Sequence, residues 1–246
     1  MKRKRYKLKK KVFVFLFIIV IAILITNKII IHKKNNDKVN NILNVTKEIK
    51  EDTKDTLKDK LIELKNMNND FVGILTIPNT IINYPVMYTK SDYYLRRSFD
   101  KKQSDAGTLF IDKHNNIEPI DDNIIIYGHN MKDGTMFHEL LNYKDENYYN
   151  EHKYIYFNKI NEIEKYEIIS VFYSKVYYEN ENVFKYYKFY NANNEEEFNY
   201  YLENIKSLSI YDTKVNAIYK DKFITLSTCE YSQENGRFVV VAKKVE

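Results

Sequence analysis

The chain of 246 residues is poor in cysteine, tryptophan, glycine and proline, with 1 Cys, 0 Trp, 5 Gly and 3 Pro. The single cysteine, Cys229, cannot form a disulfide within the chain, so the fold is not held together by disulfide bridges. Its thiol is either a small buried apolar group or a reactive one. The 5 histidines are scattered and show no His-Glu-x-x-His spacing, and one cysteine makes no pair. We therefore expect no metal site.

The sequence also lacks a basic region beyond its N-terminus. The formal net charge is +5, but residues 2–11 carry eight Lys and Arg side chains, and subtracting these eight leaves −3 for residues 12–246. Nucleic acid is thereby excluded as a partner. Neither a phosphate-binding loop nor a dinucleotide fingerprint is present, so no cofactor is expected.

The N-terminus has the pattern of a membrane anchor. A basic tail, residues 1–11, precedes an apolar run that reaches the roughly 20 residues of a spanning helix when it is extended over residues 12–31. We expect a transmembrane signal anchor there, with the basic N-terminus in the cytoplasm and a catalytic domain outside the cell membrane. A cleaved signal peptide is the alternative, but no small-x-small cleavage site follows Ile25.

Residues 32–69 are polar, with apolar residues at partly helical spacing. This segment is either a spacer helix that packs one face on the following domain or a solvated stalk. From residue 70 to 246 the pattern changes to short β-like runs, which predict a mainly β fold with accessory helices (α+β): a closed eight-stranded β-barrel with an N-terminal helical extension. The eight expected strands are residues 71–77, 81–87, 108–112, 123–127, 154–158, 166–173, 223–228 and 238–243.

Two helical segments interrupt these runs, at residues 136–149 and, before the seventh strand, at residues 194–208. The second carries an apolar stripe that predicts a packing face. The stripe consists of Phe198, Leu202, Ile205 and Leu208. Among the 23 tyrosines, the pairs at 177–178 and 186–187 either line a groove for an extended peptide or serve as amphipathic surface residues.

Three chemically active residues lie where expected strands begin or end. Cys229 follows the seventh run, Arg237 begins the eighth, and His129 comes after Gly128 where the fourth run ends. If the last two runs form an antiparallel hairpin, Cys229 and Arg237 meet across it. A parallel or crossover neighbour to the seventh strand would add His129 to the same site.

These residue types suit acyl transfer. A cysteine thiolate attacks an amide carbonyl, and nearby positive charge from Arg237 or protonated His129 favours the thiolate. His129 is able to protonate a leaving amine and to deprotonate an incoming one. Arg237 carries donors that stabilise a developing oxyanion. No Asp or Asn is identified as a third member of a papain-like triad.

Two motifs resemble those of class B sortases: Thr-Leu-Ser-Thr-Cys at residues 225–229 and Tyr-Gly-His-Asn-Met at residues 127–131, together with Arg237. The resemblance extends over about residues 70–246 and includes Gly-Thr-Leu-Phe-Ile-Asp at residues 107–112. It implies a sortase-type barrel with catalytic Cys229, His129 and Arg237. The residues that it implies in support of the site or of substrate binding are Ser227, Glu230, Thr228 and Tyr127.

The resemblance also implies a function and its partners. Sortases cleave a C-terminal sorting signal after Thr, hold the surface protein as a thioacyl enzyme, and transfer it to an amine of peptidoglycan. The acceptor is then a cross-bridge or stem-peptide amine, or its lipid-linked precursor. Class B members often use signals of the Asn-Pro-x-Thr type, and Ser-Pro-x-Thr variants occur.

Other interpretations remain open. The chain could be a non-catalytic, membrane-tethered peptide-binding protein, in which Cys229→Ala leaves function intact, or a cysteine peptidase that hydrolyses the thioacyl intermediate. A phosphatase is disfavoured because seven residues separate Cys229 from Arg237. His114 departs from the class B pattern and is expected on a surface loop. Structural roles are expected for His138 and His152, and none for His32.

Overall fold

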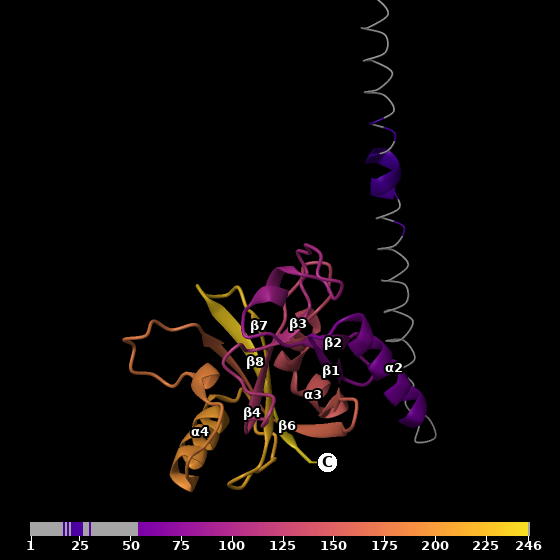
Figure 1. Cartoon of the computed structure of the whole chain (residues 1–246). Coiled ribbons are helices and arrows are strands. Elements are labelled where there is room, and N and C mark those ends of the chain that lie inside the picture. The colour runs from indigo at the N-terminus through magenta and orange to yellow at the C-terminus, as the bar shows by residue number, and fades with distance from the viewer. Residues whose placement is uncertain (1–16, 18, 20, 27–29, 31–53, 246) are drawn as a thin grey trace, which may run out of the picture. The chain divides into compact units, whose positions relative to one another are not determined.

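The computed structural model describes residues 17, 19, 21–26, 30 and 54–245 (Figure 1). The chain divides into two units, Met1–Val45 and Thr46–Glu246. In the first unit the described residues are helical, and the Thr26 hydroxyl donates to the carbonyl oxygen of Ala22 at 2.9 Å. The second unit contains every strand in the described part of the chain.

The expected single-pass localisation requires correction. Among the residues that the structure describes, no helix is long and apolar enough to cross a membrane, which contradicts that expectation. The basic tail, most of the expected anchor at 12–31, His32 and the first part of the expected spacer lie outside the described residues.

Eight strands close into a barrel, which confirms the expected architecture. Their sequences are rich in Ile, Val, Phe and Tyr, residues that fit a pleated surface with two covered faces. The strands are β1 (Phe71–Thr76), β2 (Asn83–Met87), β3 (Leu109–Ile111), β4 (Asn123–Tyr127), β5 (Tyr154–Asn158), β6 (Ile163–Lys175), β7 (Phe223–Cys229) and β8 (Gly236–Lys244).

Around the barrel the strands follow the order β1-β2-β3-β4-β7-β8-β6-β5. The neighbours β2 and β3, and likewise β4 and β7, are parallel. All other neighbouring pairs are antiparallel. A parallel pair requires a long connection, whereas an antiparallel pair such as β7 and β8 needs only a hairpin. After β4 the chain therefore crosses to the other side of the barrel, where it forms β5 and β6, and then returns so that β7 pairs with β4.

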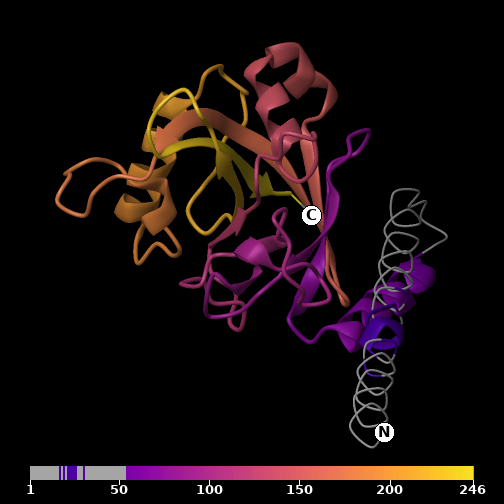
Figure 2. The same ribbon diagram turned by 90° about the horizontal axis from the view of Figure 1, so that it is seen from above.

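The barrel wall is buried on both sides along β6, β7 and β8. One hydrophobic cluster fills the interior with residues from all eight strands, including Ile224 and Leu226 of β7. A second cluster lies on the outer face, where Phe223, Val239 and Val241 contact α4 (Glu195–Leu208). Figures 1 and 2 show α4 and α2 (Lys54–Met67) on opposite sides of the barrel. Burial on both faces explains why β7 is a nearly continuous apolar run in the sequence.

The helix expected at residues 136–149 is two shorter elements. A 3-10 helix, η3 (His138–Lys144), is followed by α3 (Glu146–Glu151). Asp145 separates them, because its side chain accepts a hydrogen bond from the backbone N–H of Asn147 at 2.9 Å and so caps the start of α3.

Helix α4 was expected to bury a stripe of four residues, and this expectation is partly wrong. Its buried residues are Phe198, Tyr201 and Ile205, and Leu202 packs at the margin of the same cluster. Leu208 is 43% exposed. The helix ends at Leu208, so this side chain belongs to its last residue.

Helix α2 packs through three leucines. Leu57, Leu61 and Leu64 are buried, at spacings of four and three that place them on one face of a helix. The helix contacts β1, the first strand of the barrel.

Candidate active site

Strand pairing brings the three expected residues to one end of the barrel. In the parallel pair of β4 with β7, Tyr127 lies opposite Ser227. His129 and Cys229 follow those two residues at equal distance along the chain. In the antiparallel pair of β7 with β8, Cys229 lies opposite Arg237. The two pairings that the sequence analysis required are thus present, with Cys229 on the central strand of the three.

The site faces outward, away from the barrel interior. Side chains alternate along a strand, and Ile224 and Leu226 of β7 fill the interior. Ser227 and Cys229 therefore belong to the outer face, together with Val239 and Val241 of β8. This face is covered by α4 at one end, and at the other end Cys229, His129 and Arg237 remain partly exposed.

Three hydrogen bonds hold the loop of His129 against β7. The N–H of Gly128 donates to the carbonyl of Ser227 at 3.2 Å, and the Thr228 hydroxyl donates to the carbonyl of Gly128 at 2.8 Å. The Asn130 side-chain amide donates to the carbonyl of Cys229 at 3.0 Å. His129 thus sits in a segment whose backbone is fixed to the strand that carries the thiol.

The His129 ring contacts η2 (Tyr93–Arg96). Its Nε2 lies 2.9 Å from the carbonyl oxygen of Leu95. A carbonyl oxygen only accepts, so Nε2 carries the proton in this contact, and Nδ1 of the neutral ring is the free acceptor. The Leu95 carbonyl therefore orients the imidazole.

Arg237 is held by the loop between β7 and β8. Its Nη1 donates to the carbonyls of Gly236 at 2.9 Å and Asn235 at 3.3 Å. The guanidinium has five N–H donors, so donors remain for a substrate oxygen. No ion pair of Arg237 occurs among the residues that the structure describes, and its charge is therefore not neutralised by a carboxylate.

Two uncharged tyrosines, Tyr186 and Tyr127, lie on the same outer face below the exposed residues. The hydroxyl of Tyr186, which is 1% exposed, lies 2.7 Å from that of Ser227. Burial raises the pKa of Tyr186, and the hydrogen bond with Ser227 and the charge of Arg237 only partly offset it. Burial, together with Tyr186 and the Asp112 carboxylate, raises the pKa of Tyr127. Both phenols stay protonated at neutral pH and add no negative charge.

Three of the four expected supporting residues lie below the surface. Ser227, Thr228 and Glu230 are buried. Glu230 accepts from the backbone N–H of Ser232 at 3.0 Å and also from the Ser232 hydroxyl. Burial raises the pKa of Glu230, but these hydrogen bonds and the charge of Lys144 outweigh it and hold the pKa below its ordinary value. These residues support the strand ends and the hairpin.

The remaining histidines lie apart from the thiol. His114 is exposed on a loop, where its Nδ1 lies 2.8 Å from Asp112. His152 ends α3, and its ring stacks on Tyr148 with 4.1 Å between centroids. His138 begins η3, and its Nδ1 lies 2.7 Å from the Asn130 side-chain oxygen. Within the described ranges no group of His, Cys, Asp and Glu side chains is arranged to hold a metal ion.

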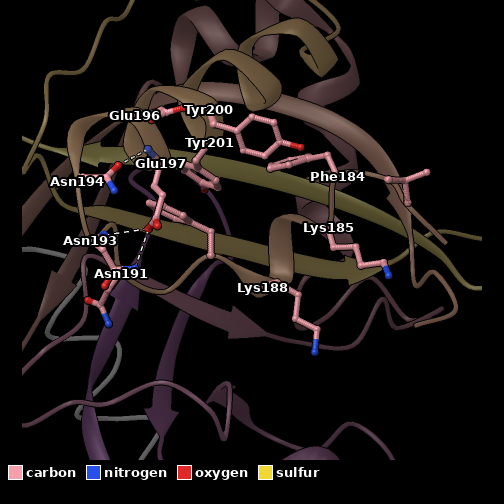
Figure 3. Close-up of a pocket in the computed structure, with 12 residues that line it drawn as sticks. Phe184, Lys185, Lys188, Asn191, Asn193, Asn194, Glu196, Glu197, Tyr200 and Tyr201 are labelled. Atoms are coloured by element: carbon pink, nitrogen blue, oxygen red, sulfur yellow. Dashed lines mark hydrogen bonds between the residues drawn. The ribbon is translucent and has the colours of Figure 1, made fainter. Parts of the chain in front are cut away.

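A separate cavity of about 790 Å³ is lined by α4 and by the segment that contains η4 (Tyr186–Lys188) (Figure 3). Phe184 and Tyr200 form its aromatic side, with Lys185 and Lys188 at its edge. Neither Cys229 nor His129 lines it. The carboxylate of Glu197 accepts hydrogen bonds from Asn193 at the base of α4, so part of the polar lining already serves to begin that helix.

Sequence reasoning missed the contacts made at the site by Tyr186, the Leu95 carbonyl and Asn130. The tyrosine pairs gave a signal, but it pointed to a groove, whereas Tyr186 is buried and Tyr178 is 74% exposed. Asn130 belongs to the quoted motif at residues 127–131, and its side-chain contacts depend on tertiary structure alone.

The chain matches a family model described as the Sortase domain over residues 75–245. Two curated proteins, both named Sortase B, are similar to it. The protein of Listeria monocytogenes is 39% identical over 193 residues, which are 77% of this chain and 75% of the relative. The protein of Staphylococcus aureus is 33% identical over 186 residues, which are 74% of this chain and 73% of the relative.

Solved structures show the same likeness. Sortase B from Bacillus anthracis in complex with AAEK1 superimposes with a TM-score of 0.67 at 34% identity, covering 76% of this chain and 84% of that one. A Staphylococcus aureus sortase B–substrate complex gives a TM-score of 0.71 at 28% identity, covering 87% and 94%. Fold, strand-end residues and relatives agree, and this chain belongs to the sortase family as a class B sortase, a cysteine transpeptidase.

Proposed function

We propose that this transpeptidase cleaves a C-terminal sorting signal after its threonine, with Cys229 as nucleophile, His129 as general acid and base, and Arg237 as oxyanion stabiliser. The protein so released is then joined to an amine of peptidoglycan. The observation that carries the proposal is the pairing of three strand ends, which sets Cys229 between His129 on one side and Arg237 on the other.

The first half-reaction forms a thioester. The Cys229 thiolate attacks the carbonyl carbon of the signal's threonine, and the carbonyl oxygen becomes an oxyanion that the unneutralised Arg237 stabilises. When the oxyanion collapses, the bond to the next residue breaks, and His129, which took the proton of the Cys229 thiol, gives that proton to the leaving amine.

The second half-reaction reverses these roles. An acceptor amine attacks the thioester carbonyl, loses a proton to His129 and expels the Cys229 sulfur, so that a new amide bond replaces the thioester. Water competes for the same intermediate, and slow hydrolysis is expected when no amine is present.

Relatives support the choice of substrates. The Staphylococcus aureus structure is a sortase B–substrate complex, and another sortase B is complexed with triglycine, which agrees with a peptide amine as acceptor. We propose a signal of the Asn-Pro-x-Thr or Ser-Pro-x-Thr type, carried by a surface protein. The proposed acceptor is a cross-bridge or stem-peptide amine, or its lipid-linked precursor.

The test is mass spectrometry of the full chain incubated with Asn-Pro-x-Thr and Ser-Pro-x-Thr peptides, with and without an amine acceptor, beside Cys229→Ala. We expect an acyl adduct on Cys229 that resolves into amine-linked product, and no adduct on the variant. An adduct that resolves only to free acid, even with amine present, would indicate a peptidase. Intact peptide bound equally by both proteins would indicate a peptide-binding protein.

A further inference from the structure

Asn130 joins the end of β7 to the start of η3 through both ends of its side-chain amide. Its Nδ2 donates to the carbonyl oxygen of Cys229 at 3.0 Å. Its Oδ1 lies 2.7 Å from Nδ1 of His138. The amide is therefore a bridge between the main chain of the proposed nucleophile and a histidine that is not part of the proposed catalytic group.

The Asn130 amide continues the hydrogen bonding to β7 beyond the end of β4. Strand β4 ends at Tyr127, opposite Ser227, so the regular β4–β7 ladder stops before it reaches Cys229. The Asn130 amide supplies a donor for the Cys229 carbonyl beyond that point. A strand-end carbonyl needs such a partner, and this one fixes the peptide plane that carries the thiol.

The Cys229 carbonyl and His138 hold the two sides of the amide. The Cys229 carbonyl only accepts, so the NH₂ group of Asn130 must face it, and the amide oxygen must face His138. His138 then donates from Nδ1. Without that donor the amide oxygen loses its partner, and only the hydrogen bond to the Cys229 carbonyl holds the side chain in place.

Both ends of the bridge rest on well-anchored structure. η3, which begins with His138, buries Leu140 and Tyr143. The backbone of Asn130 pairs with that of Met136 in an isolated antiparallel β-bridge. The N–H of Phe137 donates to the carbonyl of His129 at 2.9 Å. The same loop therefore fixes the imidazole and, through Asn130, the thiol.

We propose that Asn130 is a positioning residue for Cys229, and that His138 acts through it by orienting its amide. The inference rests on the proposed catalytic roles of Cys229 and His129. Asn130 touches the main chain and not the reacting atoms, so its loss should impair the chemical step more than the binding of peptide.

The experiment measures kcat and KM for cleavage of the preferred peptide by the full chain and by Asn130→Ala, His138→Ala, His138→Gln and the double alanine variant. We expect Asn130→Ala to lower kcat at least about tenfold, the loss of one well-placed hydrogen bond, with KM within about threefold of wild type. His138→Ala should lose a similar factor, and the double variant no more than Asn130→Ala alone.

Two variants make the result specific. His138→Gln keeps an N–H donor for the Asn130 oxygen and should recover most of the kcat lost in His138→Ala. His152→Ala is the control, because His152 is another histidine at a helix terminus but contacts Tyr148 and not the site, and the kcat of this variant should stay at the wild-type value. A kcat for Asn130→Ala within about twofold of wild type, or losses that multiply in the double variant, would overturn the proposal.

The inference and the proposed function fail separately. If the wild-type chain cleaves no peptide, the proposed function fails, and the pH profile of Cys229 alkylation by iodoacetamide then decides the role of Asn130. A displaced midpoint in Asn130→Ala supports positioning, because the thiol has moved relative to His129 and Arg237. An unchanged midpoint overturns it.

Discussion

The guanidinium of Arg237 is held by two loop carbonyls, of Gly236 and Asn235. A lysine at this position would keep the charge but lose the planar fork that bonds the loop and the oxyanion together. We expect Arg237→Lys to lower kcat for peptide cleavage by one or more orders of magnitude. Arg96→Lys, at an exposed ion pair with Asp105, should leave kcat unchanged. Near-normal turnover of Arg237→Lys would remove Arg237 from the mechanism.

Gly128 precedes the proposed general base and leaves no room for a side chain. A Cβ there would lie 2.4 Å from Leu109 Cδ2 and 2.7 Å from Phe137 Cδ2. Gly128→Ala should therefore lower the free energy of unfolding by about 1–3 kcal/mol and displace His129, with loss of activity even in the folded fraction.

The matched comparison is Gly134→Ala. Its Cβ would meet nothing within 4 Å, although its φ of +86° strains an L-residue, at about 1–2 kcal/mol. We expect this variant to lose stability and keep its activity per folded molecule. Thermal unfolding and turnover measured on both variants separate the two effects, and equal activity in the two would contradict the packing argument.

At the level of single residues, the sequence predicted those that end strands and missed those that depend on packing. Cys229, His129 and Arg237 could be found because strand alternation and turn residues define where a run stops. Tyr186 could not, because its partner Ser227 is 41 positions away and no local pattern specifies how the segment between β6 and β7 folds back. The contact between His129 and the Leu95 carbonyl has the same origin.

Single elements show where burial overrides pattern. β6 was expected at residues 166–173 and spans Ile163–Lys175. Glu164 is buried within it and pairs with Lys159 at 2.8 Å and Lys244 at 2.9 Å. In the sequence, a charged residue such as Glu164 suggests that the strand has not yet begun. In the structure the two lysines compensate the burial of its carboxylate, so the strand includes it.

Helix α2 offers a direct comparison of a buried and an exposed position. Leu61 is 1% exposed, whereas its neighbour Ile62 is 37% exposed. Leu61→Ala should cost about 2–5 kcal/mol of unfolding free energy through lost burial and a residual cavity. Ile62→Ala should cost less than about 1 kcal/mol. Chemical denaturation of both variants tests this, and equal losses would show that α2 does not pack as described.

At the scale of the whole molecule, Asp121 connects the loop before β4 with the segment that follows η4. It accepts from the backbone of Asn116 at 2.7 Å and from the side chains of Asn115 at 3.0 Å and Asn191 at 2.7 Å. Burial raises the pKa of Asp121, but these hydrogen bonds outweigh it, so the pKa lies below 3.8. The ionised carboxylate therefore stabilises the folded chain.

The stabilisation depends on pH in a defined direction. Because the pKa is lower in the folded chain than in the unfolded one, the contribution is complete above the unfolded value of 3.8 and is lost as pH falls through the folded value. Asp121→Asn should lower the free energy of unfolding by about 1–3 kcal/mol at neutral pH. The difference in unfolding free energy between the variant and the wild type should become smaller in acid. Thermal unfolding against pH measures this, with Asp105→Asn, 91% exposed, as control. A gap that is constant with pH would contradict the role of the charge.

The parallel pairing of β4 with β7 has a consequence for the order in which the enzyme becomes active. The hydrogen bond from Thr228 to Gly128 spans 100 positions, and Arg237 comes later still. Because a chain is synthesised from its N-terminus, His129 exists long before its partners, and β8 is the last strand to be made. The proposed catalytic group is therefore complete only when the last strand has closed the barrel, because Arg237 is its last member to be made.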